Sequence, residues 1–143
     1  MPLLLPPTAA ERAQAASMPI TRATAPFGHR LYYVPHQNHG RYLILGRLCW
    51  PRLVWVKRLR WQSVECGVLT NALGTHVRVM NRFIGFIGYA CWKLGMPPLQ
   101  AIVVNAQSRH PGPGYEATAA FGPEYRQTLL EIYDYDYPDD PPF

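Results

Sequence analysis

Residues 63–95 read SVECGVLTNALGTHVRVMNRFIGFIGYACWKLG, and this stretch decides the fold. Ser63 is a suitable N-cap for a short helix over Val64–Leu73, and Gly74 is suited to end that helix in a left-handed conformation. A longer helix is predicted over His76–Leu94, because its apolar side chains return every three or four residues. The buried stripe of this longer helix is formed by Val79, Phe83, Ile87 and Cys91. Two helices joined by a short glycine-containing turn indicate a helix-turn-helix.

The segment before this pair is predicted to be a helix over Arg41–Arg60. Its apolar stripe consists of Tyr42, Leu45, Cys49, Leu53, Val56 and Leu59. Pro51 lies inside the pattern and is expected to kink the helix or divide it in two. The nearby tryptophans are interpreted as core residues rather than as stacking platforms for bases; they are Trp50, Trp55 and Trp61.

The segment after the pair is predicted to form a small β-wing. Leu99–Asn105 is rich in β-branched residues and is expected to be a strand, and Tyr115–Phe121 is expected to be the returning strand. Between them, Pro111–Gly114 predicts a tight turn. A last short helix is predicted over Glu124–Ile132. The fold class is therefore α+β, mostly helical, with a winged helix-turn-helix-like body whose longer helix enters a nucleic-acid groove.

Three regions are expected along the 143 residues. Residues 1–35 are a Pro/Ala-rich N-terminal arm with one short helix, Ala9–Ala16, capped by Thr8 and Glu11. Residues 36–132 form the winged-helix-like domain, and 133–143 form an acidic aromatic C-terminal tail. Proline removes a hydrogen-bond donor and fixes φ, so both ends are expected to be irregular and flexible.

Charge is sorted along the chain. From Arg12 to Arg109 there are thirteen Lys or Arg residues and one acidic residue, Glu65, whereas seven acidic residues and one basic residue follow from Glu116 onward. This pattern predicts a body that meets a polyanion and a tail that competes for the same surface. Within the tail, Asp and Tyr alternate in a way that can imitate a nucleic-acid strand, dock on a basic protein or simply remain disordered.

The predicted contacts to nucleic acid lie on the longer helix, the preceding basic helix and the wing. They are Arg78, Asn81, Arg82, Arg47, Lys57, Arg58, Arg60 and Arg109. The wing residues are Pro111, Gly112, Gly114 and Tyr115. The bland interpretations are a solvated helix face and a basic helix that packs against the acidic tail of its own chain.

The order of these pieces resembles the C-terminal domain of O6-alkylguanine-DNA alkyltransferases and alkyltransferase-like proteins, over roughly Gln62–Tyr115. Glu65–Gly74 (ECGVLTNALG) stands where that family has T-Y-G-x-L-A-x-x-x-G, and Val77–Phe83 (VRVMNRF) stands where it has its recognition helix. The resemblance implies that Arg78 occupies the position of the arginine that enters the base stack. It also implies that His110–Tyr115 (HPGPGY) corresponds to the family's wing.

The sequence departs from that family at the reacting centre. Ala101–Asn105 (AIVVN) stands where the family has P-C-H-R, so the alkyl-accepting thiol and its histidine are missing. Alkyl transfer through that position is therefore excluded. A second resemblance, carried by Cys91–Leu99, Ala101–Asn105 and Pro111–Gly114, is to small uncharacterised proteins of bacteria and their mobile elements. It implies an ordered loop and indicates nothing about activity.

No complete catalytic motif appears, so no enzyme, cofactor or metal is predicted. Cys49, Cys66 and Cys91 lack C-x-x-C spacing and are interpreted as buried thiols. His36 and His39 have no carboxylate or cysteine at a useful spacing for a metal. Other groups without a chemical partner in the pattern are Glu65, Ser63 and Ser108.

The leading hypothesis is a non-enzymatic nucleic-acid-binding protein, with DNA favoured over RNA. The alternative is a protein-interaction module, such as an adaptor, assembly subunit or mobile-element inhibitor, that docks through residues 1–35 or 133–143. No apolar run approaches the length of a membrane span, and the opening lacks the basic start of a signal peptide. A cytoplasmic or nucleoid-associated protein is therefore expected.

Overall fold

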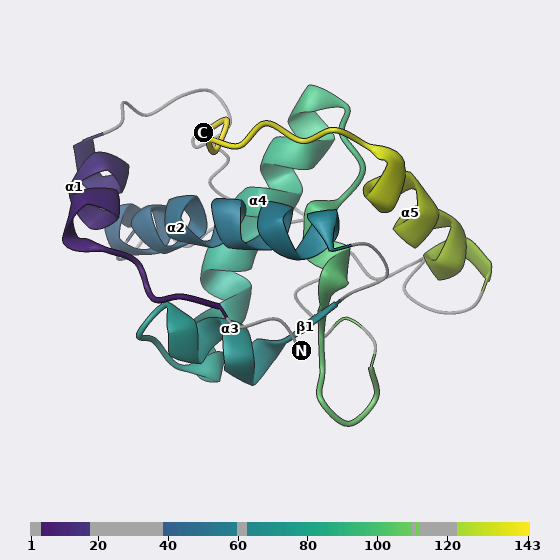
Figure 1. The fold of residues 1–143 in the computed structure, drawn as a ribbon, viewed down its shortest axis with the longest axis horizontal. Coiled ribbons are helices and arrows are strands. Elements are labelled where there is room, and N and C mark those ends of the chain that lie inside the picture. The colour runs from purple at the N-terminus through teal and green to yellow at the C-terminus, as the bar shows by residue number, and fades with distance from the viewer. Residues whose placement is uncertain (1–3, 18–38, 60–62, 110, 112–122) are drawn as a thin grey trace.

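The computed structural model describes residues 4–17, 39–59, 63–109, 111 and 123–143 (Figure 1). The helices are α1 (Ala9–Ser17), α2 (His39–Arg58), α3 (Cys66–Ala72), α4 (Met80–Leu94) and α5 (Pro123–Asp134), with 3-10 turns η2 (Val77–Val79) and η3 (Leu99–Ile102). Two short strands, β1 (Val64–Glu65) and β2 (Val103–Val104), pair in parallel. The described part is thus mostly helical, with a small sheet, and belongs to the α+β class.

The core forms where α2 crosses α4 (Figure 1). Gly46 allows the two backbones to approach closely, because a Cβ at this position would lie 3.3 Å from the Phe83 carbonyl oxygen and 3.4 Å from Phe86 Cβ. All nine residues from Phe83 to Cys91 are buried. Helix α4 is therefore the central helix of the molecule, enclosed on every side along most of its length.

The sequence pattern located the main helices. The predicted stripe of α2 is buried from Tyr42 to Val56, but Leu59 is exposed. Pro51 does not divide α2, which is one continuous helix. The glycine ends were predicted well, since Gly74 and Gly95 both have φ of 70° and follow α3 and α4.

The predicted wing is not confirmed. Leu99–Asn105 is not a strand throughout: η3 comes first, and only Val103–Val104 is extended. That pair bonds to Val64–Glu65 in parallel register, so Ser63 precedes a strand rather than capping a helix. The predicted returning strand, Tyr115–Phe121, lies outside the described residues. The two strands are parallel and are connected through α3 and α4. They therefore do not form the antiparallel hairpin that a wing requires.

The expectation of two flexible ends is wrong for the described residues. Helix α1 has the predicted capping box and packs on α2. The segment after α5 runs back across the molecule toward α2 and α4 (Figure 1). Phe143 is 1% exposed and lies against Trp50 and Phe86, with ring centroids 6.0 and 6.5 Å away. Trp50 Nε1 also donates to the Pro138 carbonyl oxygen at 2.8 Å. Aromatic packing outweighs the acidity of this segment.

Four polar side chains are buried among the described residues: Arg47, Arg52, Thr70 and Gln100. The first three donate hydrogen bonds to main-chain oxygens, as burial requires. Gln100 is the exception, since neither atom of its side-chain amide has a partner. A buried amide without hydrogen-bond partners lowers the free energy of unfolding, and this amide lies in η3.

Candidate nucleic-acid interface

Two arginines meet at one aromatic ring where α2 and α4 begin. Arg82 Nη1 donates to the Tyr42 hydroxyl at 2.8 Å, and the Arg82 guanidinium carbon is 5.5 Å from the centroid of the Tyr42 ring. The guanidinium carbon of Arg41 is 6.0 Å from the same centroid. Tyr42 is buried, whereas both arginines are exposed. The ring therefore holds two arginine side chains at the surface of the molecule.

Arg78 lies one turn before Arg82, in η2, and is exposed. His76 fixes the entry to this turn, because its Nδ1 accepts a hydrogen bond from the Arg78 main-chain N–H at 3.2 Å. Val77 beside it is 47% exposed. The part of this segment that faces solvent is thus short. It consists of η2 and the first turn of α4.

Arg12 of α1 reaches the turn just before η2. A Cβ at Gly74 would lie 3.6 Å from Arg12 Nη2, so the guanidinium group lies over this turn. Arg12 is exposed. Figure 1 shows α1 beside the first turns of α2, with α3 and its following turn below them. We call Arg12, Arg41, Arg78 and Arg82 the arginine cluster.

The arginine cluster carries four positive charges, partly opposed by the carboxylate of Glu11, which lies close to Arg12. The chain contains no acidic residue over 66–115 and only Glu65 over 12–65. The N-termini of α2 and α4 add the positive ends of two helix dipoles at the same place. Such a surface attracts polyanions, and its effect weakens as salt screens it.

Arg47 does not belong to the interface, and its predicted role as a phosphate contact is wrong. It is 3% exposed and donates through Nε to the Phe143 main-chain oxygen and through Nη1 to the Ala15 carbonyl oxygen, both at 2.9 Å. Burial lowers the pKa of its guanidinium group from the ordinary value. Arg47 holds the two ends of the chain on α2.

Lys57 and Arg58 lie at the other end of α2, against the C-terminal segment. The Lys57 ammonium is 5.9 Å from the centroid of the Tyr137 ring, and Arg58 forms an ion pair with Asp139. Tyr137 is anchored by its hydroxyl, which donates to the Pro97 carbonyl oxygen at 2.7 Å. Of the alternatives left open by the sequence, packing of the basic helix against the chain's own acidic segment is the one found here.

Arg109 is also engaged within the molecule. Its Nη1 lies 2.9 Å from Glu65 Oε1, and its Nη2 lies 3.3 Å from Ser63 Oγ. Its φ of 60° is uncommon for a residue with a side chain. Pro111 is buried. The remaining predicted residues lie outside the described part of the structure: Arg60, Gly112, Gly114, Tyr115 and the side chain of Asn81.

Cys49 and Cys91 are buried, as predicted, whereas Cys66 is only partly buried. Burial raises the pKa of Cys91 to about 12 and raises the pKa values of Cys49 and Cys66 as well. Over the described ranges, no three His, Cys, Asp or Glu side chains gather as metal ligands would. In the same part of the chain, no helix combines the length and apolarity that crossing a bilayer requires.

Comparison of the chain with models of protein families, with curated proteins and with solved structures finds no match. The resemblance to alkyltransferases remains a prediction.

The sequence pointed to Arg78 and Arg82, and Arg41 belongs to the basic helix that it predicted to follow phosphates. It missed Arg12, which it placed in a flexible arm. The signal for Arg12 was the capping box of Thr8 and Glu11, which predicted an ordered helix before the body.

Proposed function

We propose that this protein binds nucleic acid, without catalysing a reaction, through the arginine cluster. The observation that carries the proposal is the pair of exposed arginines at the Tyr42 ring, Arg41 and Arg82. Arg12 lies over the turn at Gly74, and the exposed Arg78 follows four residues after that turn. Guanidinium groups suit phosphate oxygens because their planar fork donates two hydrogen bonds at once. Arg82 is oriented in advance by Tyr42, which reduces the ordering cost of binding.

The mode of binding differs from the one that the sequence suggested. The order α3, turn, η2 and α4 is that of a helix-turn-helix, and a winged-helix relationship remains part of this proposal. However, the buried stretch Phe83–Cys91 prevents α4 from lying lengthwise in a groove. The proposed contact uses only the exposed N-terminal end of α4. DNA remains the favoured partner, held mainly through its backbone.

The experiment is a salt titration of binding to a short fluorescein-labelled DNA duplex, measured by anisotropy. The double variant Arg78→Ala/Arg82→Ala should lower the slope of log K against log salt by about 2, since each lost phosphate contact removes about 1. The matched control is Lys93→Ala/Arg126→Ala, which removes two exposed cations outside the cluster. Equal slopes for the two double variants would contradict the proposal.

A second function is favoured by one observation. Trp92 and Leu94, at the end of α4, are 51% and 52% exposed, which is unusual for side chains of this size. A protein-interaction module would use such a surface as an anchor. The acidic segment is a weaker candidate for docking than the sequence suggested, because Tyr137 and Phe143 are already buried within the molecule.

A further inference from the structure

We infer that α1 is part of the nucleic-acid-binding surface, with Arg12 as a phosphate contact that a clip between Arg52 and Glu11 holds in place. This inference rests on the proposed function and adds a residue and a positioning device to it. It concerns residues 4–17, a segment that the sequence alone indicated to be a flexible arm.

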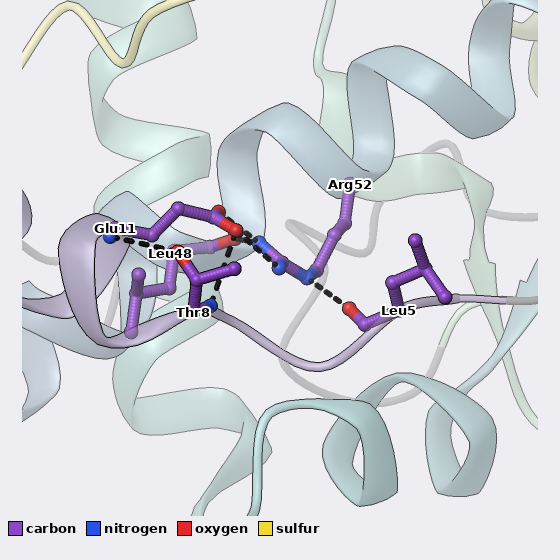
Figure 2. A network of polar contacts seen from close by, with 5 residues as sticks. All are labelled: Leu5, Thr8, Glu11, Leu48 and Arg52. Atoms are coloured by element: carbon purple, nitrogen blue, oxygen red, sulfur yellow. Dashed lines mark hydrogen bonds and ion pairs between the residues drawn. The ribbon is translucent and has the colours of Figure 1, made fainter.

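The clip is a complete network of polar contacts (Figure 2). Arg52 Nη1 lies 3.1 Å from Glu11 Oε2, and Arg52 Nη2 lies 3.3 Å from Glu11 Oε1. The same guanidinium group donates through Nε to the Leu5 carbonyl oxygen at 2.9 Å and through Nη1 to the Leu48 carbonyl oxygen at 2.8 Å. One side chain of α2 therefore binds both the approach to α1 and its first turn.

Glu11 has two tasks in this network. Its Oε1 accepts the Thr8 main-chain N–H at 3.3 Å, and its own N–H donates to Thr8 Oγ1 at 3.1 Å, which together form a capping box. Its carboxylate also receives Arg52, whose side chain is only 9% exposed. The Glu11 side chain is 40% exposed, but both of its carboxylate oxygens meet the Arg52 guanidinium group, and this two-point contact fixes the rotation of α1 about its axis.

Arg12 follows Glu11 directly, and successive helical residues point about 100° apart. With Glu11 turned toward α2, Arg12 is directed to the turn at Gly74, as its 3.6 Å approach confirms. The far end of α1 is fixed separately, because Ala15 is buried and its carbonyl oxygen accepts from Arg47. Held at both ends, α1 presents Arg12 over the turn at Gly74, which leads into η2.

The test compares three single variants of the full chain in the same salt titration with labelled duplex. Arg12→Ala should weaken binding several-fold and lower the salt slope by about 1. Glu11→Ala removes a negative charge, which by charge alone would tighten binding to a polyanion; release of α1 should instead weaken it. Asp139→Ala is the matched control, because it removes one exposed carboxylate without touching α1 and should tighten binding slightly.

The double variant Arg12→Ala/Glu11→Ala completes a thermodynamic cycle. The clip predicts that Glu11→Ala weakens binding when Arg12 is present but not when it is absent. A cooperative thermal unfolding transition in each variant, followed by tryptophan fluorescence, would show that the fold persists. Glu11→Ala that tightens binding as Asp139→Ala does, or Arg12→Ala with an unchanged slope, would overturn the inference. If Arg78→Ala/Arg82→Ala still reduces the slope, the proposed function stands without it.

Discussion

The two ends of α2 carry similar cations in opposite circumstances. At its start, Arg41 is exposed beside Tyr42 and Arg82, and no carboxylate of the described residues pairs with it. At its end, Lys57 and Arg58 face the ring of Tyr137 and the carboxylate of Asp139. The same helix thus has one end available to a polyanion and one end already neutralised by its own chain. A count of basic residues cannot distinguish these ends; only the path of the C-terminal segment does.

The basic residues in the middle of α2 have a third role. Arg47 and Arg52 are buried there. Arg47 donates hydrogen bonds to the main-chain oxygens of Phe143 and Ala15, and Arg52 donates to Glu11. Basic residues on a single helix are therefore available to a polyanion, hold the fold together or are neutralised by their own chain, according to what packs beside them.

Removing the anchor of the C-terminal segment should have the largest effect. Phe143→Ala deletes a buried ring that packs on Trp50 and Phe86, and should lower the free energy of unfolding by about 3–5 kcal/mol. Urea denaturation measures this. Leu130→Ala, which truncates an exposed side chain of α5, should change it by less than about 0.5 kcal/mol. Similar small effects for both would mean that the neutralised end of α2 is not covered by this segment.

Truncating two arginines of α2 should separate structure from binding. Arg47→Met leaves two main-chain oxygens without their donor and should cost about 2–3 kcal/mol of stability, with little change in the salt slope of binding. Arg41→Met should leave stability nearly unchanged and lower that slope by about 1. Thermal unfolding and anisotropy give the two readouts. A reversal of this pattern would break the assignment of buried and exposed arginines.

Acid should weaken the attachment of α1 to α2. The hydrogen bonds from Arg52 hold the pKa of Glu11 below its ordinary value of 4.5. A lowered folded-state pKa stabilises the fold above pH 4.5, and this contribution is lost as the pH falls through the folded value. Unfolding midpoints measured from neutral to acid pH should therefore converge for wild type and Glu11→Gln. A difference between the two midpoints that stays constant at every pH would contradict this role of Glu11.

The smallest effect is expected at the neutralised end. Arg58 and Asp139 are both largely exposed, so Asp139→Asn should change stability by less than about 1 kcal/mol. It frees Arg58, and duplex binding should tighten by a small factor that disappears at high salt. Binding that instead weakened would indicate that the C-terminal segment itself contributes to the interface.

The sequence was sufficient for features that depend on near neighbours. The capping box of α1, the stripe of α2 and the glycine ends of α3 and α4 follow from contacts within a few residues, and each is found. In α5, the prediction was short by one residue at the start and two at the end. Local hydrogen bonding and helical periodicity explain these successes.

Features that join distant segments were missed. Val64 pairs with Val103, Arg47 bonds to Phe143, and Arg52 bonds to Glu11. A helical wheel places Arg47 off the apolar stripe of α2, and only α1 and the C-terminal segment together make that position an interior one. Likewise, alternating Asp and Tyr looked like a solvated tail because the partners of Tyr137 and Phe143 lie far back in the chain.

The most direct test of the central claim is a nitrogen-15 NMR titration that follows the arginine Nε–H signals while a short DNA duplex is added. The account predicts that Arg12, Arg41, Arg78 and Arg82 shift together, while buried Arg47 and the distant Arg126 do not. Shifts confined to Arg58 and Arg126, or spread evenly over all exposed arginines, would contradict it.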